Sequence, residues 1–329
     1  MSVRNLKLTN IEASFPELSL SERMSLLDVP QSGKVPTVID SDTYNEIDDQ
    51  FAIAWALLRN DRIDLQAIYA APFTNSMFNN THDPVSDPGV GMQLSLEEIE
   101  RVLDRVDAPS KPVVFKGSTK YIKNSDNVEF SPAVNDLIQR AHKCEGVLQV
   151  VCIGAVTNIA NALLADPSII KKVHILWLGG HSLDWHNNEE FNLMQDIDAS
   201  RVLLDSGVAL TLFPCMGVTN TLATSVPEMQ HYLTDSSRIG DYLAKEAPKC
   251  PWIGFANRKV IWDIAPIGYL LDSDWYTTTF TASPVLNDNL TWTMNPKRHF
   301  IRIIKFIERD CLFVDMFQKI MSGESTCKQ

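Results

Sequence analysis

Short apolar segments rich in β-branched residues alternate with longer helical patterns between residues 34 and 213. An uninterrupted apolar run is typical of a strand buried on both faces of a parallel sheet. We therefore predict an α/β fold with an open, mostly parallel (mixed) sheet and helices on both faces. The expected strands are Pro36–Asp40, Leu65–Ala70, Pro112–Phe115, Leu148–Ile153, Val173–Trp177 and Ala209–Phe213. The expected helices are Asp49–Arg59, Leu94–Val106, Pro132–His142, Thr157–Leu164 and Asp196–Asp205.

The two ends of the chain differ from this central pattern. Residues 1–33 are polar and mixed, apart from an amphipathic stretch from Leu18 to Leu27, and we interpret them as an arm packed on the domain. Residues 34–329 are expected to form a single α/β domain, because no segment between 34 and 275 resembles a linker. After Pro266 the pattern predicts three strands and a closing helix, either as an antiparallel edge extension of the sheet or as a small subdomain. These elements are Tyr276–Phe280, Leu290–Thr293, His299–Ile307 and Asp310–Ile320.

The composition narrows the range of partners. A formal charge of −12 and a pI near 5.0 oppose binding to nucleic acid or to an anionic membrane, but not to a small neutral substrate. The six cysteines are scattered without a CxxC pair, which is typical of free thiols in a reducing compartment. No apolar run approaches the roughly 20 residues of a membrane span. We therefore expect a cytoplasmic protein.

Four aspartates follow the first expected strand, in the segment VIDSDTYNEIDDQ. Asp40 and Asp42 lie two residues apart, so an extended backbone would point them the same way. Asp48 and Asp49 fall at the start of the next helix, where the helix dipole favours negative charge. Two carboxylates about 4 Å apart repel by roughly 4 kcal/mol at an effective dielectric constant near 20. The cluster therefore indicates a bound cation, and its oxygen-only ligands favour calcium or magnesium over zinc.

Polar residues also follow other predicted strands or begin predicted helices. Thr157 and Asn158 open one helix, an amide-rich loop follows the segment HILWLGG, and Trp262-Asp263 begins another helix. Taken alone, each would be interpreted as an N-cap or a loop residue, as would each aspartate of the first segment. Neutral amides and a carboxylate also suit sugar hydroxyls. The loop contains His186, Asn187, Asn188, Glu190 and Asn192.

Together these segments resemble the inosine-uridine nucleoside hydrolase family, from about Val35 to Leu271. The aspartate segment is similar to the family's DxDxGxDD signature, and IGAVTNIANALLADP to its GPLTNLA segment. EEFNLMQDIDASRVLLDSGVALTLFP resembles the AEFNxxxDPEAA stretch, and Asp263 stands where the family has a late metal-binding aspartate. The resemblance implies a nucleoside-hydrolase-like fold, a homo-oligomer, and a calcium-dependent N-ribohydrolase that cleaves a nucleoside to free base and ribose.

The resemblance also implies a role for each matching residue. Asp42, Asp49 and Asp263 would bind Ca²⁺ together with the backbone carbonyl of Thr157. Asp42 would in addition be the general base that takes a proton from the attacking water. Asp48 would bind the ribose 2′-hydroxyl and Asp263 the 3′-hydroxyl.

The resemblance assigns the other ribose hydroxyls mainly to the amide-rich loop. A ring of such groups suits the chemistry, because cleavage of an N-glycosidic bond passes through an oxocarbenium-like sugar that carboxylates stabilise. Asp40 would brace the loop rather than touch the substrate. The hydroxyl-binding residues would be Glu190 and Asn192, helped by Asn187 or Asn188 and by Asn75.

The sequence departs from the family pattern at two positions. The spacer TYNEI, residues 43–47, is two residues longer than usual and lacks its glycine. Asn45 or Glu46 would therefore either enter the metal or sugar shell or bulge outward, and we favour the outward bulge. Trp262 stands where many members have a histidine proposed to protonate the leaving base. A tryptophan there resembles the purine-preferring branch and would stack on the base, although core packing explains it equally well.

Other loop residues are candidates for contact with the base. Aromatic residues would supply its opposite face, and a loop histidine would be a leaving-group acid, although a lone histidine there is more often solvated surface. The candidates are Trp185, Phe73, Phe78, His82, His181 and His186.

Two other functions fit part of the sequence. IDSDT also matches a DxDxT motif of HAD-like Mg²⁺-dependent phosphohydrolases, with Asp40 as nucleophile and Asp42 as acid/base. That chemistry needs a downstream lysine and a second acidic pair, and the later strand ends near 157–158, 179–180 and 214–215 have neither. The second alternative is a catalytically impaired nucleoside-binding protein, because the longer spacer lies beside the proposed general base.

Overall fold

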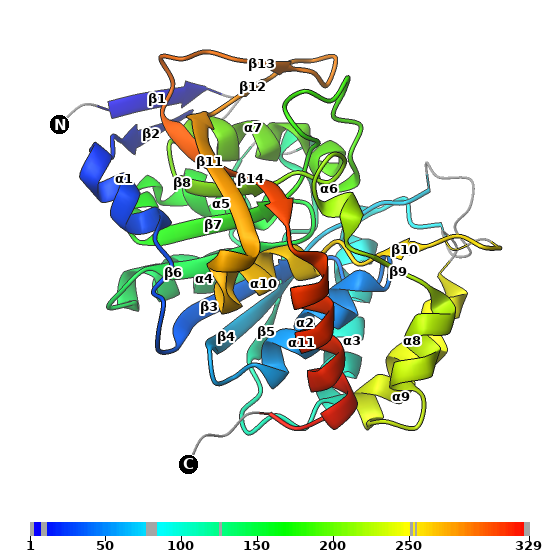
Figure 1. Ribbon diagram of the computed structural model, residues 1–329. Helices are drawn as coiled ribbons and strands as arrows, with labels where there is room; N and C mark the ends of the chain where they lie inside the picture. Colours follow the sequence, from blue (N-terminus) through cyan, green and yellow to red (C-terminus); the bar gives the residue numbers. More distant parts are fainter. Residues whose placement is uncertain are drawn as a thin grey trace.

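An eight-stranded sheet in the order β11-β14-β8-β7-β6-β3-β4-β5 forms the centre of the protein (Figure 1). The structure is a computed structural model that describes residues 3–7, 12–76, 84–124, 127–250, 253 and 255–325. Neighbouring strands are parallel, except that β11 at the edge runs antiparallel to β14. The bounds are β3 (Val35–Ser41), β4 (Ile63–Ala70), β5 (Val113–Lys116), β6 (Leu148–Cys152), β7 (Val173–Leu178), β8 (Ala209–Phe213), β11 (Tyr276–Ala282) and β14 (Phe300–Ile307). The predicted mostly parallel sheet is confirmed.

Helices cover both faces of this sheet. Successive strand residues point to opposite faces, so Val38 and Val150 belong to one core cluster while Ile39 and Val151 belong to the other. All residues of β6, β7 and β8 are buried, which explains their continuous apolar sequences. The Ile39 cluster includes α2 (Asp48–Leu58), α3 (Pro88–Arg105), α8 (Val226–Leu233), α9 (Arg238–Glu246), α10 (Ile264–Leu271) and α11 (Arg309–Ser322). The Val38 cluster includes α4 (Pro132–Lys143), α5 (Thr157–Ala165), α6 (Phe191–Gln195) and α7 (Ile197–Ser206).

The C-terminal strands extend the central sheet. β14 lies parallel to β8, and β11 then pairs with β14 in the antiparallel sense. Of the two predicted alternatives, the extension of the sheet is therefore the one observed, with only β11 antiparallel. The expected strand Leu290–Thr293 does not join the sheet. Besides the N-terminal hairpin, the described residues form two short ladders outside the sheet. One pairs β9 (Ala223–Thr224) with β10 (Lys259–Val260), and the other pairs β12 (Val285–Leu286) with β13 (Trp292–Thr293).

The N-terminal segment forms a hairpin of β1 (Val3–Lys7) and β2 (Glu12–Pro16), followed by α1 (Leu20–Leu27). Buried Arg23 of α1 donates hydrogen bonds to the backbone oxygens of Gly207, over 2.9 Å, and Val208, over 3.2 Å. These bonds fix α1 beside the start of β8 (Figure 1). The division into an arm of residues 1–33 and one domain from residue 34 stays a prediction. The described helices include none that is both long and apolar enough to cross a membrane.

The strand order reverses at β3. The chain runs from β3 outward to β4 and β5, then returns to place β6 on the other side of β3 before continuing to β7 and β8. The connections after β3 and β6 therefore diverge at the carboxyl edge of the sheet and leave a crevice, where open α/β sheets bind ligands. Both connections contain polar residues that the sequence had indicated.

Candidate active site

A cavity of about 310 Å³ opens at the carboxyl edge of the sheet. Its walls come from the segments that follow β3, β6, β7 and β8 and from the start of α10. The cavity therefore lies where the strand order predicts a ligand site. Its lining residues are Asp42, Asn45, Glu46, Asp48, Asp49, Ile153, Leu178, His181, Glu189, Glu190, Phe191, Asn192, Cys215, Met216, Trp262 and Asp263.

Two of the lining carboxylates begin α2. Asp48 and Asp49 are its first residues, and both side chains are buried. The N-cap is Ile47, so the interpretation of these aspartates as caps is wrong. Asp49 Oδ1 accepts a hydrogen bond from Ser41 Oγ over 2.5 Å, and Asp48 Oδ2 accepts one from the backbone N–H of Trp262 over 3.2 Å. The helix dipole favours negative charge at both positions.

Asp263 completes a cluster of three buried carboxylates. One oxygen each of Asp48, Asp49 and Asp263 lies within 4.8 Å of the other two. Asp263 is at the N-cap position of α10 but makes no side-chain capping hydrogen bond there. Buried carboxylates at such distances require a compensating positive charge, and an oxygen-only set suits a hard divalent cation. The donor set therefore fits a metal ion of the kind that the family resemblance implies.

Asp42 lies at the same cavity with 2% of its surface exposed. Its Oδ2 is buried and has no hydrogen-bond partner among the described residues. Because an unpaired buried carboxylate oxygen is costly, this atom is suited to an ion, a water molecule or a substrate hydroxyl. A Cβ atom at Gly154 would lie only 3.0 Å from Asp42 Oδ1. The glycine after β6 therefore leaves the space that this carboxylate occupies.

Burial and mutual repulsion raise the pKa values of Asp42, Asp49 and Asp263. Burial raises the pKa of Asp49 to about 8, and the charge of Asp48 adds to the effect. Burial, followed by the charge of Asp49, also raises the pKa of Asp42. The pKa of Asp263 rises through burial and then through the charges of Asp48 and Asp49. A divalent cation at this site would therefore compete with protons.

The long spacer after β3 turns into the site. Asn45 and Glu46 both line the cavity, so the expected outward bulge is wrong. The backbone N–H of Asn45 donates to the carbonyl of Asp42 over 2.9 Å and closes a tight turn. The Glu46 carboxylate pairs with Lys259 Nζ, which also donates to Asp48 Oδ1 over 3.1 Å. The sequence analysis did not predict Lys259 as a site residue. The only indication in the sequence is that Lys259 lies shortly before Asp263.

Glu190 and Asn192 of the amide-rich loop also reach the cavity. Glu190 is the N-cap of α6, where its oxygens accept hydrogen bonds from the backbone N–H of Asn192 over 3.0 Å and of Leu193 over 2.9 Å. Burial raises the pKa of Glu190, and these donors oppose the rise. Asn192 Nδ2 donates to the carbonyl of Ile153 over 3.3 Å and to that of Leu178 over 3.1 Å. The loop is thereby attached to the ends of β6 and β7.

Four residues that the resemblance assigned to the metal or the ribose are not part of this lining. Thr157 is fully buried as the first residue of α5, and its hydroxyl donates to Asp196 Oδ2 over 2.9 Å. Asn75 lines a neighbouring cavity, and its Oδ1 accepts from the backbone N–H of Val85 over 2.7 Å. Their proposed roles stay predictions.

The other two are neighbours in the amide-rich loop. Asn188 is fully buried and stabilises the loop, because its Oδ1 accepts from the backbone N–H of His181 over 2.9 Å. Asn187 Oδ1 accepts from the backbone N–H of Glu189 over 3.3 Å. Both amides therefore have contacts within the loop, and their roles in sugar binding also stay predictions.

Asp40 is fully buried and lies outside the cavity lining. Its Oδ1 accepts a hydrogen bond from Asn158 Nδ2 over 2.7 Å, and burial raises its pKa to about 7 against the effect of this bond. Val156 is the N-cap of α5, so the interpretation of Thr157 or Asn158 as a cap is wrong. These contacts agree with a bracing role for Asp40 and argue against the phosphohydrolase alternative, in which Asp40 is the nucleophile.

The aromatic candidates differ in their positions. Trp262 is half-buried, lines the cavity and also packs against the core, so neither interpretation excludes the other. Phe73 is fully buried in the core and is absent from the cavity lining. Trp185 contacts the rings of His181 and His186, with centroids 6.0 Å and 5.6 Å away, and is also absent from the lining. Of these rings, only Trp262 is placed to contact a ligand in the cavity.

His181 is the one histidine candidate that lines the cavity among the described residues. Its Nδ1 accepts a hydrogen bond from the backbone N–H of Met216 over 3.3 Å. Burial lowers its pKa, which disfavours the protonated form that a leaving-group acid requires. His186 is exposed. Phe78 and His82 lie outside the described residues.

The fold and the site together define an α/β protein with a cluster of buried carboxylates at the switch point of its sheet. A family model described as inosine-uridine preferring nucleoside hydrolase matches residues 37–298. The chain belongs to this family, as its motifs predicted.

Curated relatives match a shorter part of the chain. The pyrimidine-specific ribonucleoside hydrolase RihB of Escherichia coli O1:K1 / APEC is 29% identical over 102 residues, which are 30% of this chain and 31% of that protein. The putative pyrimidine-specific ribonucleoside hydrolase RihB of Shigella boydii serotype 4 (strain Sb227) is 32% identical over 87 residues, 26% of this chain and 36% of that protein. The chain thus matches about a third of the length of these relatives.

Solved structures share the fold over nearly the whole chain. A purine-preferring ribonucleoside hydrolase from Gardnerella vaginalis is 19% identical with a TM-score of 0.64, covering 88% of this chain and 98% of that one. An inosine-guanosine nucleoside hydrolase is 16% identical with a TM-score of 0.66 and the same coverage. The fold is therefore that of nucleoside hydrolases.

Proposed function

We propose that this chain is a calcium-dependent N-ribohydrolase that cleaves the N-glycosidic bond of a nucleoside to free base and ribose. The observation that carries the proposal is the approach of Asp48, Asp49 and Asp263 within 4.8 Å. Asp42, with its unpaired Oδ2, lies at the same cavity of about 310 Å³. Membership of the nucleoside hydrolase family supports the reaction, and the oxygen-only donors support calcium.

Four groups would hold the ion and move the proton. Asp42, Asp49, Asp263 and the backbone carbonyl of Thr157 would bind calcium, which when bound supplies positive charge that lowers the pKa of a water molecule. Asp42 then takes a proton from the attacking water through its free oxygen. This role requires Asp42 to be ionised, although burial favours its protonated form in the metal-free protein.

The remaining polar residues of the cavity would bind the sugar. Asp48 and Asp263 hold the 2′- and 3′-hydroxyls, and Glu190 and Asn192 hold the remaining hydroxyl. All four line the cavity. Fixing each hydroxyl orients the anomeric carbon, and the surrounding carboxylates stabilise the positive charge that develops on the sugar.

The base is proposed to be a purine. Some relatives are named as pyrimidine-specific and one solved neighbour as purine-preferring, so the relatives alone do not decide the base. Trp262 supports a purine, because its ring lies in the cavity wall and a larger base offers more area for stacking.

A panel of ribonucleosides and 2′-deoxyribonucleosides, assayed for free sugar and free base, tests the function. Purine ribonucleosides should be cleaved in calcium and not in excess chelator. Cleavage that persists in chelator would disprove the metal requirement. Tight binding without release would instead establish the nucleoside-binding alternative, and phosphate release from phosphomonoesters the phosphohydrolase.

A cytoplasmic location and a homo-oligomeric state are also part of the proposal, from the scattered cysteines and the family resemblance respectively. Cell fractionation and light scattering of the purified protein test these two points. Recovery with membranes, or a mass of one chain in solution, would contradict them.

A further inference from the structure

A buried lysine contacts the carboxylates of the cavity. Lys259 in β10 has only 3% of its side chain exposed. Its Nζ donates to Asp48 Oδ1 over 3.1 Å and to the Glu46 carboxylate. Burial of an ammonium group is unfavourable unless opposite charges and hydrogen bonds compensate for lost hydration. The carboxylates of Glu46 and Asp48 provide this compensation for Lys259. The proposed metal ion would then be held by the other acids of the cavity.

Both oxygens of Asp48 have donors from one segment of the chain. Lys259 Nζ reaches Oδ1, and the backbone N–H of Trp262 reaches Oδ2 over 3.2 Å. Donors at both oxygens restrict rotation of the carboxylate more than one donor would. The segment from 259 to 262 therefore decides in which direction Asp48 presents its oxygens.

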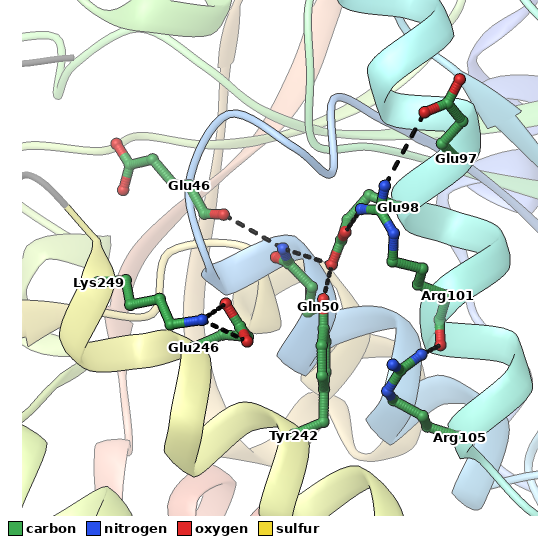
Figure 2. A network of polar contacts seen from close by, with 9 residues as sticks. All are labelled: Glu46, Gln50, Glu97, Glu98, Arg101, Arg105, Tyr242, Glu246 and Lys249. Carbon is green, nitrogen blue, oxygen red and sulfur yellow. Dashed lines mark hydrogen bonds and ion pairs between the residues drawn. The ribbon is translucent and has the colours of Figure 1, made fainter. Parts of the chain in front are cut away.

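Glu46 is fixed on two sides. Its backbone carbonyl accepts a hydrogen bond from Gln50 Nε2 over 3.3 Å, and the same nitrogen donates to Glu98 Oε1 over 3.3 Å. Glu98 in turn accepts hydrogen bonds from Tyr242 and Arg101. Figure 2 shows the Glu46 carboxylate pointing away from this network, while its carbonyl points toward Gln50. The inserted spacer is thus attached to α2, α3 and α9 on one side and to Lys259 on the other.

The second ion pair gives Lys259 an acceptor outside the proposed ligands of the cation. A lysine has a flexible stem and three donors, so it would compete with a divalent cation for the oxygens of nearby carboxylates. Glu46 offers an alternative acceptor that keeps Nζ beside Asp48. Glu46, which belongs to the spacer that departs from the family pattern, is therefore paired with Lys259. Lys259 in turn contacts Asp48, the residue proposed to bind the sugar.

We propose that Lys259 is a positioning residue that directs Asp48 toward the ribose 2′-hydroxyl, and that Glu46 holds Lys259 in place. The inference rests on the proposed function, because it assumes that Asp48 binds this hydroxyl. Loss of Lys259 should therefore impair substrates that have a 2′-hydroxyl more than substrates that lack it.

The test is the ratio of kcat/KM for a purine ribonucleoside to that for its 2′-deoxy counterpart, measured in calcium. Lys259→Met removes the charge and should lower this ratio about tenfold to a hundredfold, the range for a hydrogen bond to a charged group. Lys259→Arg retains a donor and a charge and should restore most of the ratio. Glu46→Gln keeps the shape of the spacer and should lower the ratio less than Lys259→Met does.

A matched control is available in the neighbouring cavity. Lys249 pairs with Glu246 over 2.8 Å (Figure 2), and both residues line that cavity but not the one with the carboxylate cluster. Lys249→Met should leave the ratio unchanged. If Lys259→Met does not fold, as its melting curve would show, Glu46→Gln and Lys259→Arg still provide the comparison.

An unchanged ratio in Lys259→Met or, where that variant does not fold, in Glu46→Gln would overturn the inference. An equal loss on both substrates also leaves the ratio unchanged, because it reflects general structural damage, and it overturns the inference in the same way. If the wild-type protein cleaves no nucleoside, the proposed function fails separately. Calorimetry then measures the affinities of the wild type and the variants for ribose and 2-deoxyribose. The ratio of these two affinities replaces the ratio of kcat/KM, and an unchanged ratio again overturns the inference.

Discussion

Asn158 donates a hydrogen bond to Asp40 over 2.7 Å and so connects the start of α5 to the end of β3. The same Nδ2 reaches the carbonyl of Ala70 at the end of β4 over 3.3 Å. Its Oδ1 accepts from the backbone N–H of Ser118 over 2.6 Å. One amide therefore joins the ends of two strands to the segment after β5, at the edge of the sheet where the carboxylates gather.

Asn158→Ala should destabilise the protein strongly. The substitution leaves buried acceptors and a buried backbone N–H without partners, and such groups cost roughly 1–3 kcal/mol each. We expect the free energy of unfolding to fall by about 3 kcal/mol in urea denaturation. Asn135→Ala in α4 removes an exposed amide and should change it by less than about 0.5 kcal/mol. A loss below about 1 kcal/mol for Asn158→Ala would show that this amide is not a structural connection.

Asp42→Asn should abolish most turnover while the protein stays folded. The amide cannot accept a proton as a base, and loss of a general base typically slows a reaction about 10²–10⁴-fold. Initial rates with a purine ribonucleoside measure the loss, and melting curves check the fold. Asp288→Asn changes an aspartate whose side chain is 98% exposed and should keep full activity. Full activity in Asp42→Asn would refute the assignment of the base.

The free energy of unfolding of the metal-free protein should fall as pH rises. A salt-bridged aspartate has the opposite effect, because its pKa is lowered in the folded protein. Burial raises the pKa of Asp49 to about 8 and that of Asp40 to about 7, above the ordinary value of 3.8 in the unfolded chain. The folded state therefore binds more protons in this window, so its stability should fall as pH rises from about 4 to 8. Urea unfolding in chelator at pH 5.5, 7.0 and 8.5 measures the trend.

Calcium should reverse much of this trend. Its ligands must be ionised, so binding at pH 7 should release protons and affinity should increase with pH up to about 8. Calorimetry in buffers with different ionisation enthalpies counts the protons released. Stability in chelator that rises with pH would mean that these carboxylates are ionised in the metal-free protein, contrary to the burial argument.

Trp262→Ala should impair purine substrates more than pyrimidine substrates. Stacking adds about 0.5–1.5 kcal/mol beyond the buried area, and a purine offers the larger surface. We expect kcat/KM to fall several-fold more for inosine than for uridine. Trp185→Ala is a suitable comparison, because Trp185 is absent from the cavity lining and should have a smaller effect. Equal losses on both nucleosides would assign Trp262 to core packing alone.

Local patterns accounted for most of the central fold. The six apolar runs became β3 to β8 with bounds within two residues of those expected. Burial on both faces explains the continuous apolar sequences of β6, β7 and β8, whereas β5 is partly exposed. The pattern did not identify α8 and α9. In α9 the buried residues Ile239, Gly240, Leu243 and Ala244 recur at helical spacing, so the sequence carries the apolar period of this helix and the prediction omitted it.

The amino-acid sequence by itself determined which residue types gather at the carboxyl edge, because the ends of the predicted strands and the family motifs identify Asp42, Asp49 and Asp263. Only the tertiary structure decided that Asp40 faces Asn158, that Glu46 turns inward, and that Lys259, 213 residues further along the chain, pairs with it. The physical reason is that side-chain direction and charge pairing between distant segments depend on how the backbone packs, and no local period or spacing encodes that packing.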